Sequence, residues 1–297
     1  MRRLRLLQGQ LQRHRCGLAS VPTDGAGPDT SLISRLQSVP GMQSLLTTEE
    51  EALGDGCFVG LMGDADGTAL QPLQTRRLLD ELRRSGRWKR EKDENGKQDR
   101  FTWYVGDGPS CVFGYSGISL SPEPWPANAS RLRDWLHTVL QLDGPKERLT
   151  GCLLNKYPAG QGMIPWHSDE VRAHGGTDLN LIVSVSLGGP RDILMRRKKR
   201  GGESEDGGEG EGTGTGADPA SALPRRFALH SGSLFVMAGD TQTFFEHTLP
   251  LPLKDACAWV RGVEPDESVS PLRISLTYRS IQPGFEQQLK ASDIISD

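Results

Sequence analysis

The residues with the clearest capacity for chemistry are His167 and Asp169, which stand one residue apart in WHSDE (166–170). A His-x-Asp pair can be a turn with a capping aspartate or two of the three ligands of a metal site, and most such pairs are structural. A third ligand would favour the metal. The candidates are the remaining histidines of the chain: His14, His137, His174, His230 and His247.

His247 is the best placed of these, because it follows the predicted strand SLFVMAGD (233–240) at a rim that a second sheet edge could share with the His-x-Asp turn. His167, Asp169 and His247 would then form a two-histidine, one-carboxylate face with three coordination positions open. Such a face suits non-haem Fe(II), which must bind a cosubstrate and dioxygen together. An iron site is therefore one hypothesis, beside the structural interpretation of the pair.

The stretch RISLTYRS (273–280) supplies two positive charges that could bind an anionic cosubstrate. Arg273, Ser275 and Arg279 share parity and so project from one face of a strand, with about 20 Å between the arginines. Side chains leaning inward from both ends could bracket a small dicarboxylate, whereas unpaired burial of either charge would be costly. A solvent face is the alternative, but the opposite face is apolar too: Ile274, Leu276 and Tyr278.

Upstream, LLNKYPAG (153–160) places Asn155 and Tyr157 on one strand face, from which they could donate hydrogen bonds to the same dicarboxylate. From residue 150 onward, short alternating segments such as LNLIVSVSLG (179–188) predict strands, and Gly/Pro punctuation between them favours an antiparallel sandwich or barrel. Before residue 150 we expect two helices. Leucines 73, 78, 79 and 82 mark the first, and the second runs from about Ser130, as N-cap, to Leu142, with Gly144 as its stop.

Composition bounds the function. The 297 residues carry a net charge of −3, so any contact with nucleic acid would have to come from local basic patches such as RRSGRWKR (83–90) and RRKKR (196–200). A solvated face explains each patch equally well, and the second also fits a nuclear import signal. The five cysteines are scattered, which argues against a disulfide framework or zinc finger. The chain has no run of about 18 apolar residues, so we expect no segment to span a membrane.

Some segments look unable to fold alone. Residues 1–23 hold five arginines and no acid before Asp24, which fits either an organelle presequence or a solvated basic tail. Residues 20–40 have the composition of a linker. The stretch from about 198 to 224 is acidic and glycine-rich, and we expect it to be a disordered insertion between two strands.

Four ordered motifs carry a family resemblance. N-x-Y (155–157), H-S-D (167–169), a distant histidine and RISLTYR (273–279) resemble the AlkB family of Fe(II)- and 2-oxoglutarate-dependent dioxygenases, in particular its eukaryotic branch that repairs alkylated nucleic acid. FTWYVGDG (101–108) and FGYSGISLSPEPWP (113–126) add to it, since the family carries a similar aromatic strand followed by a P-x-P-W turn. The resemblance covers roughly residues 95 to 283.

The resemblance implies a fold: α+β, mainly β, with a double-stranded β-helix (jelly-roll) core, flanking N-terminal helices and a nucleotide-recognition lid. We accordingly expect a basic tail and linker over residues 1–44 and an N-terminal extension with substrate-recognition strands over 45–149. The catalytic core would span 150–283, interrupted by the insertion at about 198–224, and a C-terminal tail 284–297 would follow. The interval between His247 and Arg273 is longer than the family usually has, and predicts a surface loop.

The resemblance also implies roles. His167, Asp169 and His247 match the iron ligands. Arg273 matches the arginine that pairs with the distal carboxylate of 2-oxoglutarate, where bidentate geometry favours arginine over lysine. Tyr157 and Ser275 would give that carboxylate further hydrogen bonds. The residues near the metal-chelating end of the cosubstrate would be Asn155 and Arg279.

On the substrate side, Phe113 and Tyr115 match aromatics that stack on a flipped base, although core packing is the other explanation for both. Ser116 and Glu170 complete the expected substrate contacts. Members that act on methylated adenine and cytosine often carry an acid where this chain has Val171, and Glu170 could substitute for it. The base preference is therefore open.

The activity implied is oxidative demethylation of N-alkylated bases of the 1-methyladenine and 3-methylcytosine type in DNA or RNA, with release of formaldehyde, succinate and CO2. It requires Fe(II), 2-oxoglutarate and O2. The alternatives are an RNA demethylase, an oxygenase acting on a protein or lipid, and an inactive barrel that only binds nucleic acid. We expect a monomer that binds alkylated DNA or RNA and no membrane, located in the nucleus or, given the Arg-rich N-terminus, in a mitochondrion or other organelle.

Overall fold

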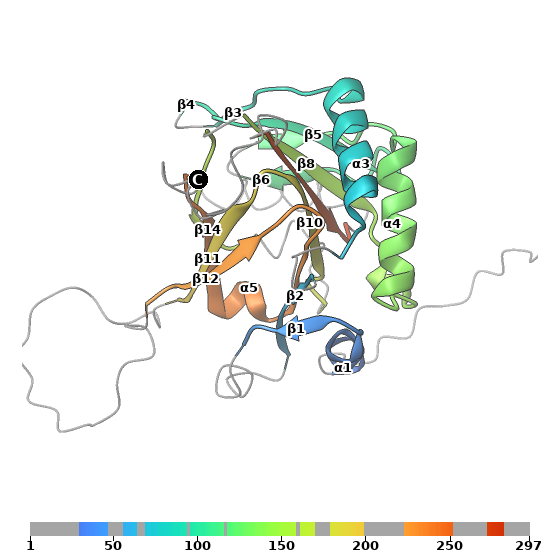
Figure 1. The fold of residues 1–297 in the computed structure, drawn as a ribbon, viewed down its shortest axis with the longest axis vertical. Helices are drawn as coiled ribbons and strands as arrows, with labels where there is room; N and C mark the ends of the chain where they lie inside the picture. The colour runs from blue at the N-terminus through green and yellow to red at the C-terminus, as the bar shows by residue number, and fades with distance from the viewer. Residues whose placement is uncertain are drawn as a thin grey trace, which may run out of the picture.

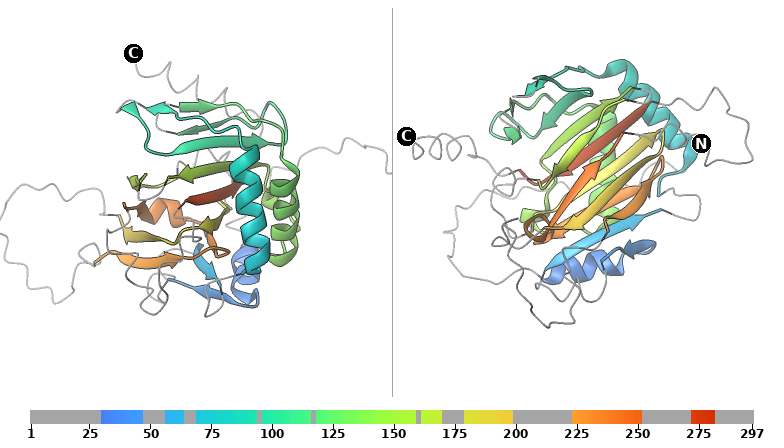
Figure 2. Two further views of the ribbon diagram at one scale, coloured as in Figure 1. Left: turned by 45° about the horizontal axis from the view of Figure 1, so that its top comes forward. Right: turned by 90° about the vertical axis from the view of Figure 1, so that its left-hand side faces the viewer.

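The molecule is built in layers around two antiparallel β-sheets. The computed structural model describes residues 30–46, 56–63, 69–93, 96–115, 118–158, 161–169, 179–198, 223–251 and 272–281. Helices α3 (Pro72–Ser85) and α4 (Ala127–Val139) lie side by side against one face of the larger sheet (Figures 1 and 2). The smaller sheet packs on the other face, and this arrangement leaves a cavity between the two sheets.

The larger sheet joins strands that are far apart in the sequence. Its seven strands, in spatial order, are β1 (Met42–Ser44), β2 (Cys57–Met62), β13 (Leu234–Gly239), β10 (Ile182–Gly188), β15 (Arg273–Arg279), β8 (Gly151–Tyr157) and β5 (Phe101–Gly106). The smaller sheet has the order β12 (Arg225–Leu229), β11 (Arg191–Arg197), β14 (Phe245–Leu249) and β9 (Ile164–His167).

Two short hairpins and a single turn of 3-10 helix lie outside the two main sheets. The hairpins pair β3 (Lys92–Asp93) with β4 (Gly96–Lys97), and β6 (Phe113–Tyr115) with β7 (Ile118–Leu120). The 3-10 turn, η1, spans Pro145–Glu147. The prediction of an antiparallel, mainly β fold is confirmed among these residues.

Strand alternation divides the polar site from the core. In β15 the residues Ile274, Leu276 and Tyr278 are fully buried in the main apolar cluster beneath the helices. The residues of opposite parity point to the cavity: Arg273, Ser275, Thr277 and Arg279. Because side chains alternate across a strand, one seven-residue segment serves both the core and the site. The arginine-bearing face of β15 therefore lines the cavity and is not a solvent face.

The two predicted helices exist, with shifted ends. In α3, Leu82 is fully buried and Leu78 and Leu79 pack against the main apolar cluster, but Leu73 is 74% exposed and does not belong to the buried face. Helix α4 starts at Ala127, three residues before the predicted N-cap at Ser130, and ends at Val139. Pro126 is its N-cap, in extended backbone with φ −70°. The proline and the P-x-P-W turn before it fix the start, so Ser130 lies inside the helix.

The prediction of a tail and linker up to residue 44 is wrong for its last part. Residues Thr30–Ser38 form helix α1, and β1 follows at the edge of the large sheet. Leu32, Leu36 and Val39 are spaced for one helical face and are buried in the main cluster. Most of the Gly and Pro residues that suggested a linker lie before Thr30. The linker prediction therefore treated two different segments, one Gly- and Pro-rich and one helical, as a single segment.

The expected domain boundary at residue 150 does not coincide with a boundary in the sheet. Strand β2 pairs with β13, and β5 pairs with β8, so strands from both sides of residue 150 share one sheet. Several predictions fall outside the described residues: the basic tail, most of the insertion at 198–224, the long interval after His247 and the C-terminal tail. The strands that flank the insertion, β11 and β12, pair with each other. Among the described helices, none is long and apolar enough to cross a membrane.

Candidate metal centre

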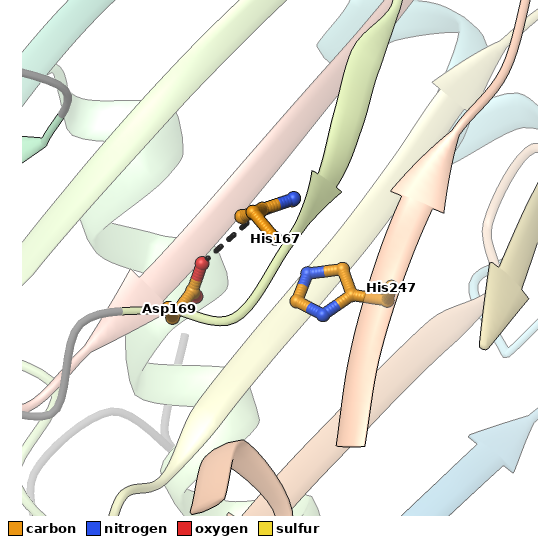
Figure 3. Close-up of side chains that lie close together, drawn as sticks. All are labelled: His167, Asp169 and His247. Atoms are coloured by element: carbon orange, nitrogen blue, oxygen red, sulfur yellow. Dashed lines mark ion pairs between the residues drawn. The ribbon is translucent and has the colours of Figure 1, made fainter. Parts of the chain in front are cut away.

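The two candidate histidines lie on neighbouring strands of the smaller sheet. His167 ends β9, and His247 stands directly opposite it on β14 (Figure 3). Facing residues of an antiparallel pair have Cβ atoms about 5 Å apart, which brings their side chains together. The imidazole ring centroids are 4.2 Å apart. A single strand pairing therefore brings together two histidines that lie far apart in the sequence.

Asp169 is brought to the histidines by the turn that follows β9. The backbone N–H of Asp169 donates a hydrogen bond to Gln242 Oε1 at 2.8 Å, and Ser168 Oγ donates to the carbonyl oxygen of Phe245 at 2.8 Å. Asp169 Oδ1 lies 3.4 Å from His167 Nε2, the contact drawn in Figure 3. Ligand atoms of the two histidines and the aspartate all lie within 4.8 Å of one another.

Arg279 gives Asp169 an internal counterion. Its Nη2 donates to Asp169 Oδ2 at 2.7 Å, and both side chains are nearly buried. Burial by itself would raise the pKa of Asp169, but the Arg279 guanidinium and the hydrogen bond with His167 hold that pKa well below its ordinary value. The carboxylate is thus ionised, as a metal ligand must be.

The histidines differ in their surroundings. Burial, reinforced by the neighbouring His167, lowers the pKa of His247 to about 3, so this imidazole is neutral near pH 7. Burial would also lower the pKa of His167, but the hydrogen bond and charge of Asp169 outweigh it and raise that pKa above its ordinary value. His247 Nδ1 is buried and has no hydrogen-bond partner among the described residues. Two imidazole nitrogens and one carboxylate are a donor set that fits Fe(II).

The other end of β15 carries a buried charge with few partners. Arg273 is 3% exposed, donates from Nη2 to Ser186 Oγ at 3.1 Å, and lies over the Tyr157 ring at 5.1 Å. Its Nε and Nη1 have no hydrogen-bond partner in the described part of the chain. Burial lowers the pKa of Arg273. A buried guanidinium with free donors is a binding site for an anion, and a carboxylate matches its geometry.

A cavity of about 320 Å³ connects the two ends. The predicted site residues that line it are Asn155, Tyr157, His167, Asp169, His247, Arg273, Ser275 and Arg279. One part of its lining is apolar, comes from both sheets and includes Ile182, Ile193 and Phe235. The cavity therefore offers a metal-binding face at one end and anion-binding donors at the other, which fits a dicarboxylate cosubstrate that also chelates the metal.

The aromatic residues predicted to face a base lie at the β6 side of the cavity. Phe113 and Tyr115 line it, with ring centroids 5.8 Å apart, and the Arg279 guanidinium lies over the Phe113 ring at 4.8 Å. Phe113 also packs in an apolar cluster with Tyr104. Both explanations of Phe113, core packing and cavity lining, thus apply. Ser116 and Glu170 fall outside the described residues.

Sequence reasoning missed several cavity residues. Arg100 donates from Nε to Asn155 Oδ1 at 3.1 Å, and Tyr115 Oη donates to Gln98 Oε1 at 3.3 Å. Gln242 and Ser186, which hold Asp169 and Arg273 and are not among the residues that line the cavity, were not singled out either. These residues come from the segment before β5, from α5 (Thr241–Phe244) and from β10. Only the polar face of β10, Ser184 and Ser186 in an otherwise apolar strand, gave a signal in the sequence.

Arg191, also missed, supports both ligand strands. It is buried and donates hydrogen bonds to the carbonyl oxygens of Gln161, Gly162 and Pro250. These carbonyls lie just before β9 and just after β14, the strands that carry the histidines. Burial and the nearby Arg273 lower the pKa of Arg191 to about 10, so it remains charged near pH 7.

The two basic elements are partly neutralised. Arg87 and Lys89 both lie 3.4 Å from carboxylate oxygens of Glu123. In the second element, Arg196 forms an ion pair with Glu246 at 2.6 Å and lies over the Trp166 ring at 4.2 Å. Their predicted role as phosphate contacts stays a prediction.

Comparison with known proteins agrees with the geometry. Residues 69–279 match the family model of the 2OG-Fe(II) oxygenase superfamily. The DNA oxidative demethylase ALKBH2 of Arabidopsis thaliana is 30% identical over 157 residues, covering 52% of this chain and 48% of the relative. The alpha-ketoglutarate-dependent dioxygenase alkB homolog 3 of Bos taurus is 27% identical over 215 residues, covering 69% and 61%.

A solved structure of a 2OG-Fe(II) oxygenase family oxidoreductase from Burkholderia pseudomallei gives a TM-score of 0.44 at 12% identity, over 87% of this chain and 92% of that one. The chain spans about half the length of the ALKBH2 relatives it matches.

Proposed function

Because the chain belongs to the AlkB family of the 2OG-Fe(II) oxygenase superfamily, we propose that it is a 2-oxoglutarate-dependent dioxygenase that removes methyl groups from N-alkylated bases of DNA or RNA. The observation that carries the proposal is the cavity with a His–Asp–His face at one end and the unpartnered donors of Arg273 at the other. That pairing matches a metal and a chelating dicarboxylate in one enclosed space.

In this proposal His167, Asp169 and His247 hold Fe(II). The bound iron supplies the oxidative chemistry, in which decarboxylation of 2-oxoglutarate to succinate is coupled to oxidation of a C–H bond by O2. Arg279 keeps Asp169 ionised and fixes its orientation through the 2.7 Å contact. Gln242 and Ser168 hold the backbone of the turn, so the three ligands stay close together without the metal.

The cosubstrate would lie along the polar face of β15. Arg273 pairs with the distal carboxylate, and Ser275 and Tyr157 line the same part of the cavity. Asn155, held by Arg100, lies on the neighbouring strand near the chelating end. The apolar wall formed by Ile182, Ile193 and Phe235 excludes water from the carbon chain of the cosubstrate. Positioning and exclusion of water are the contributions of the protein.

We further propose that the two sheets are a double-stranded β-helix and that the hairpins β3–β4 and β6–β7 form the nucleotide-recognition lid. Phe113 and Tyr115 on β6 would flank a base that has left its stack. The relatives named DNA oxidative demethylase support a nucleic-acid substrate. A base inside a duplex could not reach the cavity, so the nucleotide must be flipped or already single-stranded.

The test incubates the protein with Fe(II), ascorbate, 2-oxoglutarate and oligonucleotides that carry methylated bases, including 1-methyladenine and 3-methylcytosine. Mass spectrometry follows the loss of about 14 mass units (CH2) for each methyl group removed, and succinate and formaldehyde are measured in parallel. We expect demethylation by the wild type and by His230→Ala, whose histidine is exposed and outside the site, and none by His167→Ala. Succinate release with every methyl group left intact would contradict a nucleic-acid substrate. Full activity of His167→Ala would contradict the metal centre.

A further inference from the structure

Arg191, at the start of β11, lies next to the residues proposed to hold the distal carboxylate of the cosubstrate. Its guanidinium lies over the Tyr157 ring at 5.5 Å, and the guanidinium of Arg273 lies over the same ring at 5.1 Å. Tyr157 and Arg273 line the cavity, whereas Arg191, which is 7% exposed, is not among the lining residues. Arg191 can therefore act on a ligand only through its neighbours or through its charge.

Two buried positive charges thus lie on either side of a shared aromatic contact, with no carboxylate paired to them in the described part of the chain. The hydrogen bonds of Arg191 go to carbonyl oxygens, and that of Arg273 goes to a hydroxyl. After burial, the charge of Arg273 is the next cause that lowers the pKa of Arg191. Asp192 pairs instead with Arg226 at 2.8 Å. An anion that entered the cavity beside Arg273 would offset the repulsion between the two guanidiniums.

The hydrogen bonds of Arg191 also fix the backbone that packs on Tyr157. Arg191 Nη2 donates to the carbonyl oxygen of Gly162 at 2.7 Å and to that of Pro250. Gly162 has a φ of +75° and lies so close to the ring that a Cβ there would come within 2.8 Å of Tyr157 Cδ1. Arg191 therefore holds Tyr157 in two ways, by direct contact of the guanidinium and through the backbone of Gly162.

We infer that Arg191 is a positioning residue that makes the cavity selective for a 2-oxo acid with a second carboxylate. It holds Tyr157 beside Arg273 and adds a second positive charge near the distal carboxylate, which it does not touch. The inference rests on the role that the proposed function gives to Arg273, and it holds for any base that is demethylated. The alternative is a role in folding alone, in which Arg191 only ties β9 to β14.

The test compares the binding of 2-oxoglutarate with that of 2-oxopentanoate, which has the same chain length and the same chelating end but a methyl group in place of the distal carboxylate. Titration of the Co(II)-loaded protein, followed by its absorption spectrum, gives a Kd for each compound without turnover. The proteins are the wild type, Arg191→Gln, Arg191→Lys and, as a control, Arg76→Gln on the exposed face of α3. The ratio of the two Kd values is internal to each variant, so a loss of folded protein or of metal cancels.

We expect the wild type and Arg76→Gln to bind 2-oxoglutarate about 100-fold more tightly than 2-oxopentanoate, because a charge-assisted contact distinguishes the two. Arg191→Gln should reduce this ratio by about tenfold, or about 1.4 kcal/mol, mainly by weakening 2-oxoglutarate. Arg191→Lys keeps the charge and should retain a higher ratio than Arg191→Gln.

Equal weakening of both compounds in Arg191→Gln, with the wild-type ratio kept, is the result of a role in folding alone and would overturn the inference. A ratio in Arg191→Lys no higher than in Arg191→Gln would overturn it too, because the charge would then have no effect. Neither result bears on the proposed function. Equal affinity of the wild type for the two compounds would instead contradict the proposed role of Arg273 and, with it, the cosubstrate site.

Discussion

Arg273 and Arg279 leave the same face of β15, one at each end of the strand, and both are almost fully buried. Arg279 has its counterion inside the protein, because its Nη2 lies 2.7 Å from Asp169 Oδ2. Arg273 has a serine hydroxyl and an aromatic ring, and two of its nitrogens have no described partner. Burying an uncompensated charge is costly, so the Arg273 guanidinium is fully stabilised only when an anion binds to it.

The difference separates two tasks within one cavity. The end at Arg279 is organised in advance, since ion pair, turn and strand pairing hold the three metal ligands together. The end at Arg273 is left incomplete, and in the proposed function the cosubstrate completes it. Substitutions at the first end should therefore affect both folding and metal binding, whereas substitutions at the second should affect mainly 2-oxoglutarate.

The largest effect is expected for Asp169→Asn. The variant loses an anionic metal ligand and leaves Arg279 buried without a counterion, so we expect no detectable Fe(II)-dependent turnover. We also expect the free energy of unfolding of the metal-free protein to fall by about 3–5 kcal/mol. Chemical denaturation and a Mn(II) titration measure the two effects.

A matched control for this variant is Asp192→Asn, which breaks a surface pair with Arg226 at 2.8 Å. Surface pairs contribute about 0–1 kcal/mol, so this variant should unfold close to the wild type. If Asp169→Asn were as stable as Asp192→Asn, the internal counterion would have no energetic role, and the contrast between the two arginines would fail.

Arg273→Gln should behave in the opposite way toward stability. Removing an incompletely paired buried charge should leave the metal-free protein as stable as the wild type or more so. The affinity for 2-oxoglutarate should fall by about 100-fold or more, since a charge-assisted bidentate contact is lost. Calorimetric titration of the Mn(II)-loaded protein gives the affinity, and thermal unfolding gives the stability.

Arg273→Lys tests whether charge or geometry matters at this position. Lysine keeps the charge but cannot form two parallel hydrogen bonds, so it should recover only part of the affinity. A strongly destabilised Arg273→Gln protein would show that Arg273 is already paired before the cosubstrate binds, and would erase the difference from Arg279.

Gln242→Met should weaken metal binding by about tenfold, the lower end of what outer contacts of metal ligands contribute. Methionine keeps the packing of the side chain but removes the acceptor for the Asp169 N–H, whose hydrogen bond measures 2.8 Å. Gln242→Glu keeps an acceptor oxygen and should restore most of the affinity. The absorption spectrum of the Co(II)-loaded protein reports ligand geometry apart from activity. Equal affinity and spectra in Gln242→Met and the wild type would show that the turn holds Asp169 without this contact.

The sequence predicted the parts of this site that depend on local periodicity. The alternation of RISLTYR separated Arg273, Ser275 and Arg279 from the apolar face, and the structure has that division. The His-x-Asp spacing and the order of motifs along the chain led to His247. No local pattern indicates that His247 faces His167 directly, since a strand pairing between residues 80 apart is set by tertiary packing.

What the sequence missed lies mostly in segments whose role is fixed by their neighbours. Arg100 lines the cavity because β5 pairs with β8. Gln242 reaches the Asp169 turn because the single-turn helix α5 is anchored to β2, where the backbone N–H of Phe58 donates to the buried Thr241 Oγ1 at 3.2 Å. Helix α1 was assigned to a linker because its leucines are few and follow a Gly- and Pro-rich stretch. In each case the deciding contact is made with a distant strand, and local composition gives no sign of it.

The smallest effect is expected for Ser186→Ala, which tests how incomplete the pairing of Arg273 is. Ser186 Oγ is the hydrogen-bond acceptor of Arg273 Nη2, at 3.1 Å. Its loss should weaken 2-oxoglutarate binding by about fivefold, or about 1 kcal/mol, because the guanidinium loses the contact that orients it. Ser184→Ala, two residues along the same face, removes a hydroxyl that contacts Thr277 and should leave the affinity unchanged. An equal loss of affinity in Ser186→Ala and Arg273→Gln would show that the Ser186 hydroxyl already holds the Arg273 guanidinium in place before the cosubstrate binds. Arg273 would then be positioned in advance, as Arg279 is.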